Sequence, residues 1–258
     1  MMKRSGIIIL SSLLLTALSI SGCDGTTPAS DTSASFSEGM TFVQSKFVRT
    51  SYCDWIDSST ATYDYDDAGL LNKTFYFDKD GKMTGWDTNY NYDDNGNELV
   101  HIQYDTEGNA LNFTSREYDD EGRVTKYTQY DKSGEVIQST EYKYTTDDKG
   151  NLTKMSCYDQ DGKLGQEVEY DEHGQKSKDI YYWSDESTAY YDYKNEYDAA
   201  GKNIKTSIYV RYYSADEEPS LESYNEMKYD QYGNMTGLDH FDSTGKLEFH
   251  YDIEYTAV

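Results

Sequence analysis

Hydrophobic and polar positions alternate along most of the chain with a period of two residues. In residues 163–170 (KLGQEVEY), Leu164, Val168 and Tyr170 share one parity, while lysine and glutamate fill most of the other. Side chains at i and i+2 point to the same side of an extended strand. The pattern therefore predicts β-strands with one buried and one wet face.

A short motif interrupts this alternation at regular intervals: an aromatic residue, Asp, any two residues, and Gly. Tyr118-Asp119-Asp120-Glu121-Gly122 is one copy, and Thr146 replaces the ring in another. The twelve motif glycines are Gly69, Gly81, Gly96, Gly108, Gly122, Gly134, Gly150, Gly162, Gly174, Gly201, Gly233 and Gly245. Asp can accept a hydrogen bond from a backbone N–H two residues on, and Gly tolerates positive φ, so each copy predicts a tight turn.

The spacing of these turns predicts the fold class. Successive glycines are mostly 12 to 16 residues apart, which leaves strands of about seven to ten residues. We expect an all-β protein, a repetitive antiparallel β-hairpin meander that forms an elongated, twisted or curled sheet. Two wider intervals, around 183–195 and 213–225, predict longer strands or loops. Whether the sheet closes on itself stays open.

The motif resembles the YD repeat of the Rhs family. Gly122-Arg123-Val124, Gly150-Asn151-Leu152 and Gly233-Asn234-Met235 carry the nearest matches, and the resemblance covers about residues 63–252. Large members of that family wind their sheets into a hollow shell. This chain has far fewer strands, so we expect an open sheet instead.

The first 38 residues have a different character from the rest. A basic start, an apolar run from Ile7 to Leu18 and small residues before Cys23 are typical of an export signal. Ile20-Ser21-Gly22-Cys23 resembles a bacterial lipobox, which implies lipidation of Cys23. We predict a lipoprotein signal peptide over 1–22, a flexible tether over 23–38 and a YD-like β-repeat domain over 39–258. The predicted location is the extracytoplasmic face of a bacterial cell membrane, with the membrane as a partner through the lipid.

Charge and composition narrow the range of partners. The formal net charge of −25 disfavours nucleic acid, which requires clustered Lys and Arg. The 28 tyrosines instead suit stacking on sugar rings or packing between strands. Residues 75–86 (FYFDKDGKMTGW) also resemble one unit of the choline- and glucan-binding repeats of Gram-positive surface proteins.

These features favour a non-catalytic binding or adhesion module for a cell-wall or host glycan or a protein ligand. Trp86, Tyr90 and Tyr92 share parity on one predicted strand and form the candidate ligand-binding patch. The alternative interpretation of their rings is cross-strand packing. Two other functions stay open: an immunity-type or structural surface protein that binds a secreted toxin or envelope partner, and a carboxylate-dependent glycan-active enzyme.

The sequence contains no pattern of residues typical of a catalytic or metal site. The four histidines are scattered, and nucleophile and phosphate-loop motifs are missing, so we expect no enzyme activity and no cofactor. Asp78-Lys79-Asp80-Gly81 resembles half of a calcium loop but lacks the remaining ligands, so no metal site is predicted. Whether Cys53 and Cys157 form a disulfide stays open.

Overall fold

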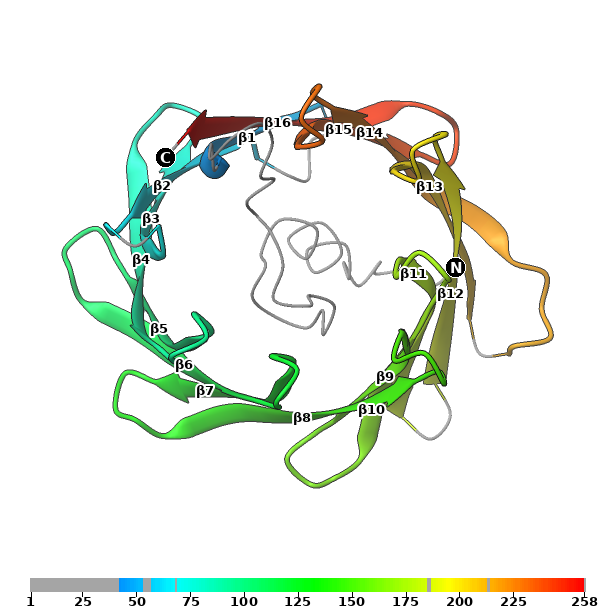
Figure 1. Ribbon diagram of the computed structural model, residues 1–258, viewed down its shortest axis with the longest axis horizontal. Helices are drawn as coiled ribbons and strands as arrows, with labels where there is room; N and C mark the ends of the chain where they lie inside the picture. Colours follow the sequence, from blue (N-terminus) through cyan, green and yellow to red (C-terminus); the bar gives the residue numbers. More distant parts are fainter. Residues whose placement is uncertain (1–41, 53–56, 68, 185–186, 213, 258) are drawn as a thin grey trace, which may run out of the picture.

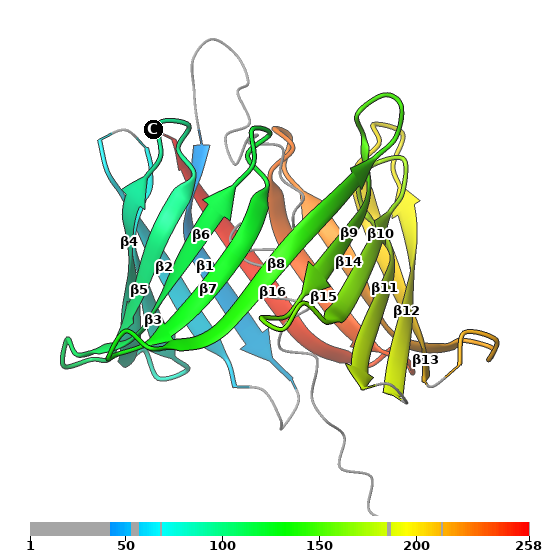
Figure 2. The same ribbon diagram turned by 90° about the horizontal axis from the view of Figure 1, so that it is seen from below.

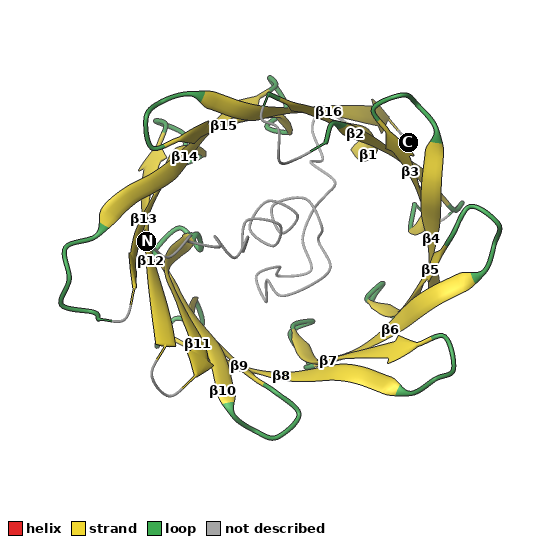
Figure 3. Ribbon diagram, turned by 180° about the vertical axis from the view of Figure 1, so that it is seen from behind, coloured by secondary structure: helices red, strands yellow, loops and turns green. Residues whose placement is uncertain are grey.

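The computed structural model describes residues 42–52, 57–67, 69–184, 187–212 and 214–257, and these form strands, turns and loops without a helix (Figure 3). The sixteen strands are β1 (Phe42–Ser51), β2 (Ser59–Tyr65), β3 (Leu71–Asp78), β4 (Met83–Tyr92), β5 (Glu98–Tyr104), β6 (Ala110–Tyr118), β7 (Val124–Asp131), β8 (Val136–Thr146), β9 (Leu152–Tyr158), β10 (Leu164–Tyr170), β11 (Lys176–Ser184), β12 (Ser187–Tyr197), β13 (Asn203–Tyr212), β14 (Ser220–Tyr229), β15 (Met235–Asp242) and β16 (Leu247–Ala257). None of the described residues belongs to a helix long and apolar enough to cross a membrane. The predicted signal peptide and tether lie outside the described residues.

The strands form one closed antiparallel barrel in which each strand pairs with its neighbours in the chain (Figures 1 and 2). The predicted meander is confirmed, but the expectation of an open sheet is wrong. β1 pairs with β2 on one side and with β16 on the other, from Phe42 opposite Ala257 to Ser51 opposite Phe249. Closure removes both sheet edges, whose unpaired N–H and C=O groups would otherwise be available to other chains.

All twelve motif copies form the predicted turns. In the β6–β7 turn the Gly122 N–H donates to the Asp119 carbonyl at 3.0 Å, and the Asp119 N–H donates to the Arg123 carbonyl at 2.9 Å. The Asp119 carboxylate accepts bonds from the N–H groups of Glu121 and Arg123 at 3.1 and 2.9 Å. Gly122 has φ of 77°, in the left-handed region that glycine enters at little cost. The motif is therefore a complete hydrogen-bonded turn.

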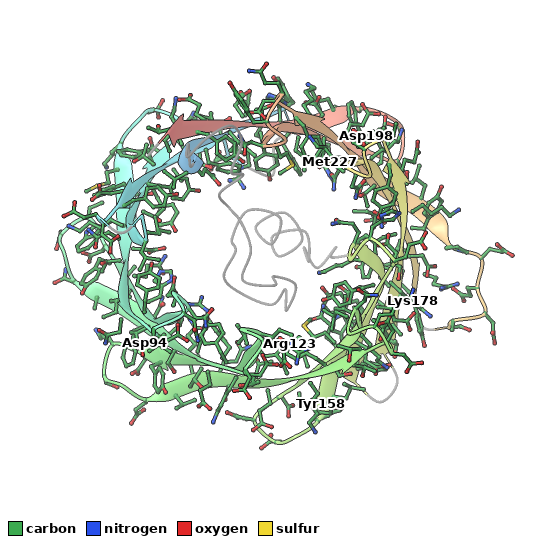
Figure 4. The ribbon with its side chains drawn as sticks, in the orientation of Figure 1. Asp94, Arg123, Tyr158, Lys178, Asp198 and Met227 are labelled. Atoms are coloured by element: carbon green, nitrogen blue, oxygen red, sulfur yellow. The ribbon has the colours of Figure 1, made fainter. Side chains whose placement is uncertain are left out.

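The inner wall of the barrel holds most of the buried side chains. Three hydrophobic clusters line it: one centred on Met155 and Val168, one on Tyr191 and Ile208, and one on Leu238 and Phe249. Met227 packs against the last cluster and lies on the inner side of the ring of strands (Figure 4). Side chains on a concave wall converge, so the inward-facing residues are the more buried ones on most strands; Thr128 on β7 is a buried residue of the outer wall.

The motif aromatics point inward at one rim of the barrel and outward at the other. The tyrosine rim, where even-numbered strands pass to odd-numbered ones, has the inward-facing rings Tyr65, Tyr92, Tyr118, Tyr170, Tyr197 and Tyr229. At the opposite rim the motif rings Phe77, Tyr104, Tyr130, Tyr158 and Phe241 face outward. Consecutive hairpins are related by a rotation of half a turn about an axis in the sheet perpendicular to the strands. That rotation exchanges the two faces of the sheet. The same turn motif therefore directs its aromatic ring to the inner wall at one rim and to the outer wall at the other.

Candidate functional site

The structure places two residues of the predicted ligand patch, Trp86 and Tyr92, on opposite walls of the barrel. Trp86 is half-buried on the outer wall and stacks on Tyr104 with ring centroids 4.2 Å apart and planes inclined by 6°. Tyr92 lies on the inner wall, where its hydroxyl donates to the Leu71 carbonyl. The backbone of Tyr90 pairs with Val100 in β4–β5, but its side chain lies outside the described residues. Cys23, the predicted lipidation site, also lies outside them.

One backbone angle explains why Trp86 and Tyr92 do not share a face. Asn91 has φ of 53°, and it is the one non-glycine residue with positive φ in the described chain. A left-handed residue reverses the alternation of side chains, so Tyr92 joins the inward ring of the tyrosine rim. If side chains alternated strictly along β4, Tyr92 would face outward like Trp86. The prediction that Trp86 and Tyr92 share one face is therefore wrong.

Trp86 instead belongs to a row of rings across the outer wall, here named the outer aromatic strip: Phe75, Trp86, Tyr104, Phe113 and Tyr130. Phe75, Trp86 and Tyr104 are direct cross-strand partners on β3, β4 and β5. Phe113 stacks on Tyr130 with centroids 4.6 Å apart. Phe113 is opposite Ile102 rather than Tyr104, so the strip consists of two groups of rings, Phe75–Trp86–Tyr104 and Phe113–Tyr130, on five consecutive strands about 4.8 Å apart.

A lysine on β3 lies beside the rings at one end of this strip. The Lys73 ammonium lies 5.6 Å from the centroid of the Trp86 ring. All five rings are half-buried, which leaves part of each ring open to solvent. Flat, partly exposed rings beside a hydrogen-bond donor are groups that bind sugar C–H faces and hydroxyls.

A second group of residues, here named the inner polar network, lies on the inner wall of β3 to β6. It comprises Tyr76, Asp87, Glu98, His101 and Arg116. The Tyr76 hydroxyl donates to the Asp87 Oδ2, and the His101 Nε2 lies 3.1 Å from the same oxygen. Arg116 pairs with the Glu98 Oε1, which is 3.7 Å from the other ring nitrogen of His101.

The electrostatics of this network favour binding over covalent chemistry. Burial and the neighbouring Asp87 carboxylate raise the pKa of the Tyr76 hydroxyl well above its ordinary value, so Tyr76 stays a neutral donor. Both ring nitrogens of His101 face carboxylates, those of Asp87 and Glu98, and its backbone is opposite Thr114. The network can hold a ligand by hydrogen bonds and charge.

The inner polar network was not predicted from the sequence. The available signal was parity: Arg116 shares the face of Thr114 and of the motif residue Tyr118, where an apolar residue is expected. A charged residue on a buried face requires a partner, but the sequence does not say that Glu98 and His101 reach it from β5.

No metal centre is found in the described part of the chain, where no group of three His, Cys, Asp or Glu side chains is arranged to hold an ion. Cys157 is buried in the wall beside Met155 and Tyr142, and Cys53 lies outside the described residues.

Comparisons with known proteins give structural neighbours only. No protein-family model matches the sequence, and no curated protein is similar to it. A porin-like protein from Bacteroides uniformis is 14% identical with a TM-score of 0.48, and one from Bacteroides vulgatus is 10% identical with a TM-score of 0.40. Each comparison covers 83% of this chain and 98% of the neighbour. TcdB2-TccC3 without its hypervariable C-terminal region is 13% identical with a TM-score of 0.26, over 75% of this chain and 14% of the neighbour.

Proposed function

We propose that this protein is an exported, lipid-anchored surface protein with a non-catalytic YD-like repeat domain that binds a glycan through the outer aromatic strip. The observation that carries the proposal is the nearly coplanar, partly exposed Trp86–Tyr104 pair, which continues in register to Phe75, with a second stacked pair, Phe113–Tyr130, on the next two strands. Packing between strands explains contacts between rings. It does not explain why all five rings remain partly open to solvent.

The polarity of the outer wall supports a binding surface that faces water. Outward side chains form cross-strand ion pairs, among them Lys46–Glu254 at 2.8 Å, Arg211–Asp192 at 2.7 Å and Lys228–Asp239 at 2.8 Å. A lysine or arginine on a lipid-facing wall costs roughly 2–4 kcal/mol at the bilayer midplane. We infer that the barrel stands in water, joined to the membrane by lipid on Cys23.

The row of rings also favours an extended ligand. Rings on successive strands, about 4.8 Å apart, can stack on successive residues of a chain that crosses the strands. The Lys73 ammonium at one end of the strip adds a donor for hydroxyl or carboxylate groups. We therefore propose an oligosaccharide of several residues as the ligand class.

A glycan and peptidoglycan array probed with the purified protein tests this function. We expect a specific signal that falls about tenfold in affinity in Trp86→Ala, a loss of about 1.4 kcal/mol. Trp183→Ala is the matched control, because Trp183 is 46% exposed but lies away from the strip and stacks on Tyr212. A blank array, or an equal loss in both variants, would reject the glycan proposal and direct the search to protein partners.

A further inference from the structure

The buried side-chain polar atoms of the described residues that have no hydrogen-bond partner include the Asp87 Oδ1 and the Thr114 Oγ1, both on the inner wall of β4–β6. Asp87 is 4% exposed and Thr114 is 7% exposed. A buried donor or acceptor without a partner costs about 1–3 kcal/mol, and more when the group is charged. A ligand bound beside these two atoms could supply the missing hydrogen-bond partners and remove this cost.

The strand register places these two atoms on either side of one strand. Asp87 on β4 is opposite Gln103 on β5, and His101 on β5 is opposite Thr114 on β6. Asp87 contacts His101 through its other carboxylate oxygen, at 3.1 Å. The unpartnered atoms therefore belong to one patch of the inner wall that is continuous with the inner polar network.

Charge selects the kind of ligand. In the described chain Arg116 pairs with Glu98, whereas the only ionisable partner of Asp87 with a basic side chain is His101. No lysine or arginine pairs with Asp87 among the described residues, so its carboxylate is held by the Tyr76 hydroxyl and the His101 ring alone. A cationic N–H donor would satisfy the Asp87 Oδ1 and supply the charge partner that Arg116 gives to Glu98.

We propose that the inner wall at β4–β6 binds a small cationic amine. Its ammonium group donates to the Asp87 Oδ1, and a hydroxyl or carbonyl on the same molecule pairs with the Thr114 hydroxyl. A neutral polyol could reach the same atoms but would leave the Asp87 charge without compensation, which disfavours it. The Arg116 guanidinium lies 5.7 Å from the centroid of the Tyr127 ring and limits the patch on the β7 side.

Ethanolamine and ethylene glycol are matched probes for this site, since they have the same size but only the first carries a positive charge. We expect ethanolamine to bind in isothermal titration calorimetry and to raise the melting temperature, and ethylene glycol to do neither. Asp87→Asn should abolish ethanolamine binding and raise the melting temperature of the ligand-free protein, because it removes a buried charge without full compensation. Thr114→Val should weaken binding about tenfold without loss of stability.

Thr128→Val is the control, since Thr128 is similarly buried but on the outer wall, 3.4 Å from the Ser139 hydroxyl. It should leave ethanolamine binding unchanged. Absence of ethanolamine binding, equal binding of both probes, or binding retained in Asp87→Asn would overturn the proposal. If Asp87→Asn fails to fold, binding that is unchanged in Thr114→Val overturns it. Trp86→Ala should not alter ethanolamine binding, so this site and the proposed glycan surface can fail independently.

Discussion

The Tyr118 hydroxyl donates a hydrogen bond of 2.6 Å to the backbone carbonyl of Glu98, the residue at which the preceding strand begins. The same relationship recurs around the tyrosine rim: Tyr65 to Gln44, Tyr144 to Val124, Tyr229 to Asn203 and Tyr255 to Met235. Most of the accepting residues lie two positions after a motif glycine, and at Val124, Asn203 and Met235 the ladder also shifts by one residue, which leaves a carbonyl for a side-chain donor. Tyr118 and Tyr229 thus each join their own turn to the preceding turn at the same rim.

Removal of one such hydroxyl should destabilise the barrel. We expect Tyr118→Phe to lower the free energy of unfolding by about 1 kcal/mol, because the Glu98 carbonyl loses its donor in a half-buried position. Urea denaturation measures the difference. Tyr158→Phe is the control: Tyr158 faces outward under the Lys143 ammonium, 4.5 Å from its ring, and no bond to its hydroxyl is recorded in the described chain. Equal effects of the two substitutions would contradict the proposed role of the inner hydroxyls.

The distribution of Tyr and Phe agrees with this role. Every aromatic motif residue at the tyrosine rim is Tyr, whereas Phe77 and Phe241 occur at the opposite rim, where the ring faces outward and needs no hydroxyl. Where Thr146 replaces the motif ring at the tyrosine rim, Tyr144 donates to Val124 in its place.

The left-handed glycines are a second source of stability. Gly134 has φ of +89°, and a Cβ added there would meet no atom within 4 Å, so only the backbone conformation opposes a side chain. We expect Gly134→Ala to cost about 1–2 kcal/mol in the free energy of unfolding, from the left-handed angle alone. Gly165→Ala is the control, since Gly165 lies in β10 outside the left-handed region and its added Cβ would be 3.9 Å from the Cys157 carbonyl. That substitution should be neutral or slightly stabilising.

The turns and strands could be predicted from the sequence because each depends on a few neighbouring residues. Asp119 and Gly122 form their turn without help from distant parts of the chain. Closure could not be predicted, because it depends on β1, which precedes the first motif and pairs with β16 at the other end of the sequence. The inner polar network joins residues of four strands, and its members become neighbours only through register.

Two histidines should give opposite pH dependences. His240 is 1% exposed, and burial lowers its pKa to about 4, despite the opposing charge of Asp242. The unfolded chain binds a proton at His240 near pH 6.5, before the folded protein does, so stability falls as the pH falls from 6.5 toward 4. The loss is at most about 3 kcal/mol. His240→Gln should remove this loss in urea denaturation at pH 7 and pH 4.5. An unchanged slope in the variant would show that His240 does not control it.

His250 contributes in the other direction. Burial of its ring acts to lower the pKa, but hydrogen bonds to Asp252 at 2.9 Å and Asp239 at 2.5 Å outweigh burial and raise it. Its stabilising contribution is therefore complete below the ordinary value of about 6.5 and is lost as the pH rises through the raised pKa. Titration of the ring protons by NMR should show His250 losing its proton above pH 6.5. His250→Gln should be less stable than the native protein at pH 6 and nearer to it at pH 9. A ring that titrates below 6.5 would contradict the assigned ion pairs.

At position 91, substitution by glycine should destabilise the protein less than substitution by a β-branched residue. Its φ of 53° turns Tyr92 to the inner wall, where the Tyr92 hydroxyl reaches the Leu71 carbonyl. A β-branched side chain is strongly disfavoured at positive φ, so we expect Asn91→Val to lower the free energy of unfolding by about 1–2 kcal/mol. Asn91→Gly should be neutral or stabilising at the same position, because glycine adopts this angle without steric cost.

Thr62→Val, at a half-buried β2 position with ordinary backbone angles, controls for the introduction of valine into a strand. If Asn91→Val is as stable as Asn91→Gly, the left-handed angle does not determine the orientation of Tyr92.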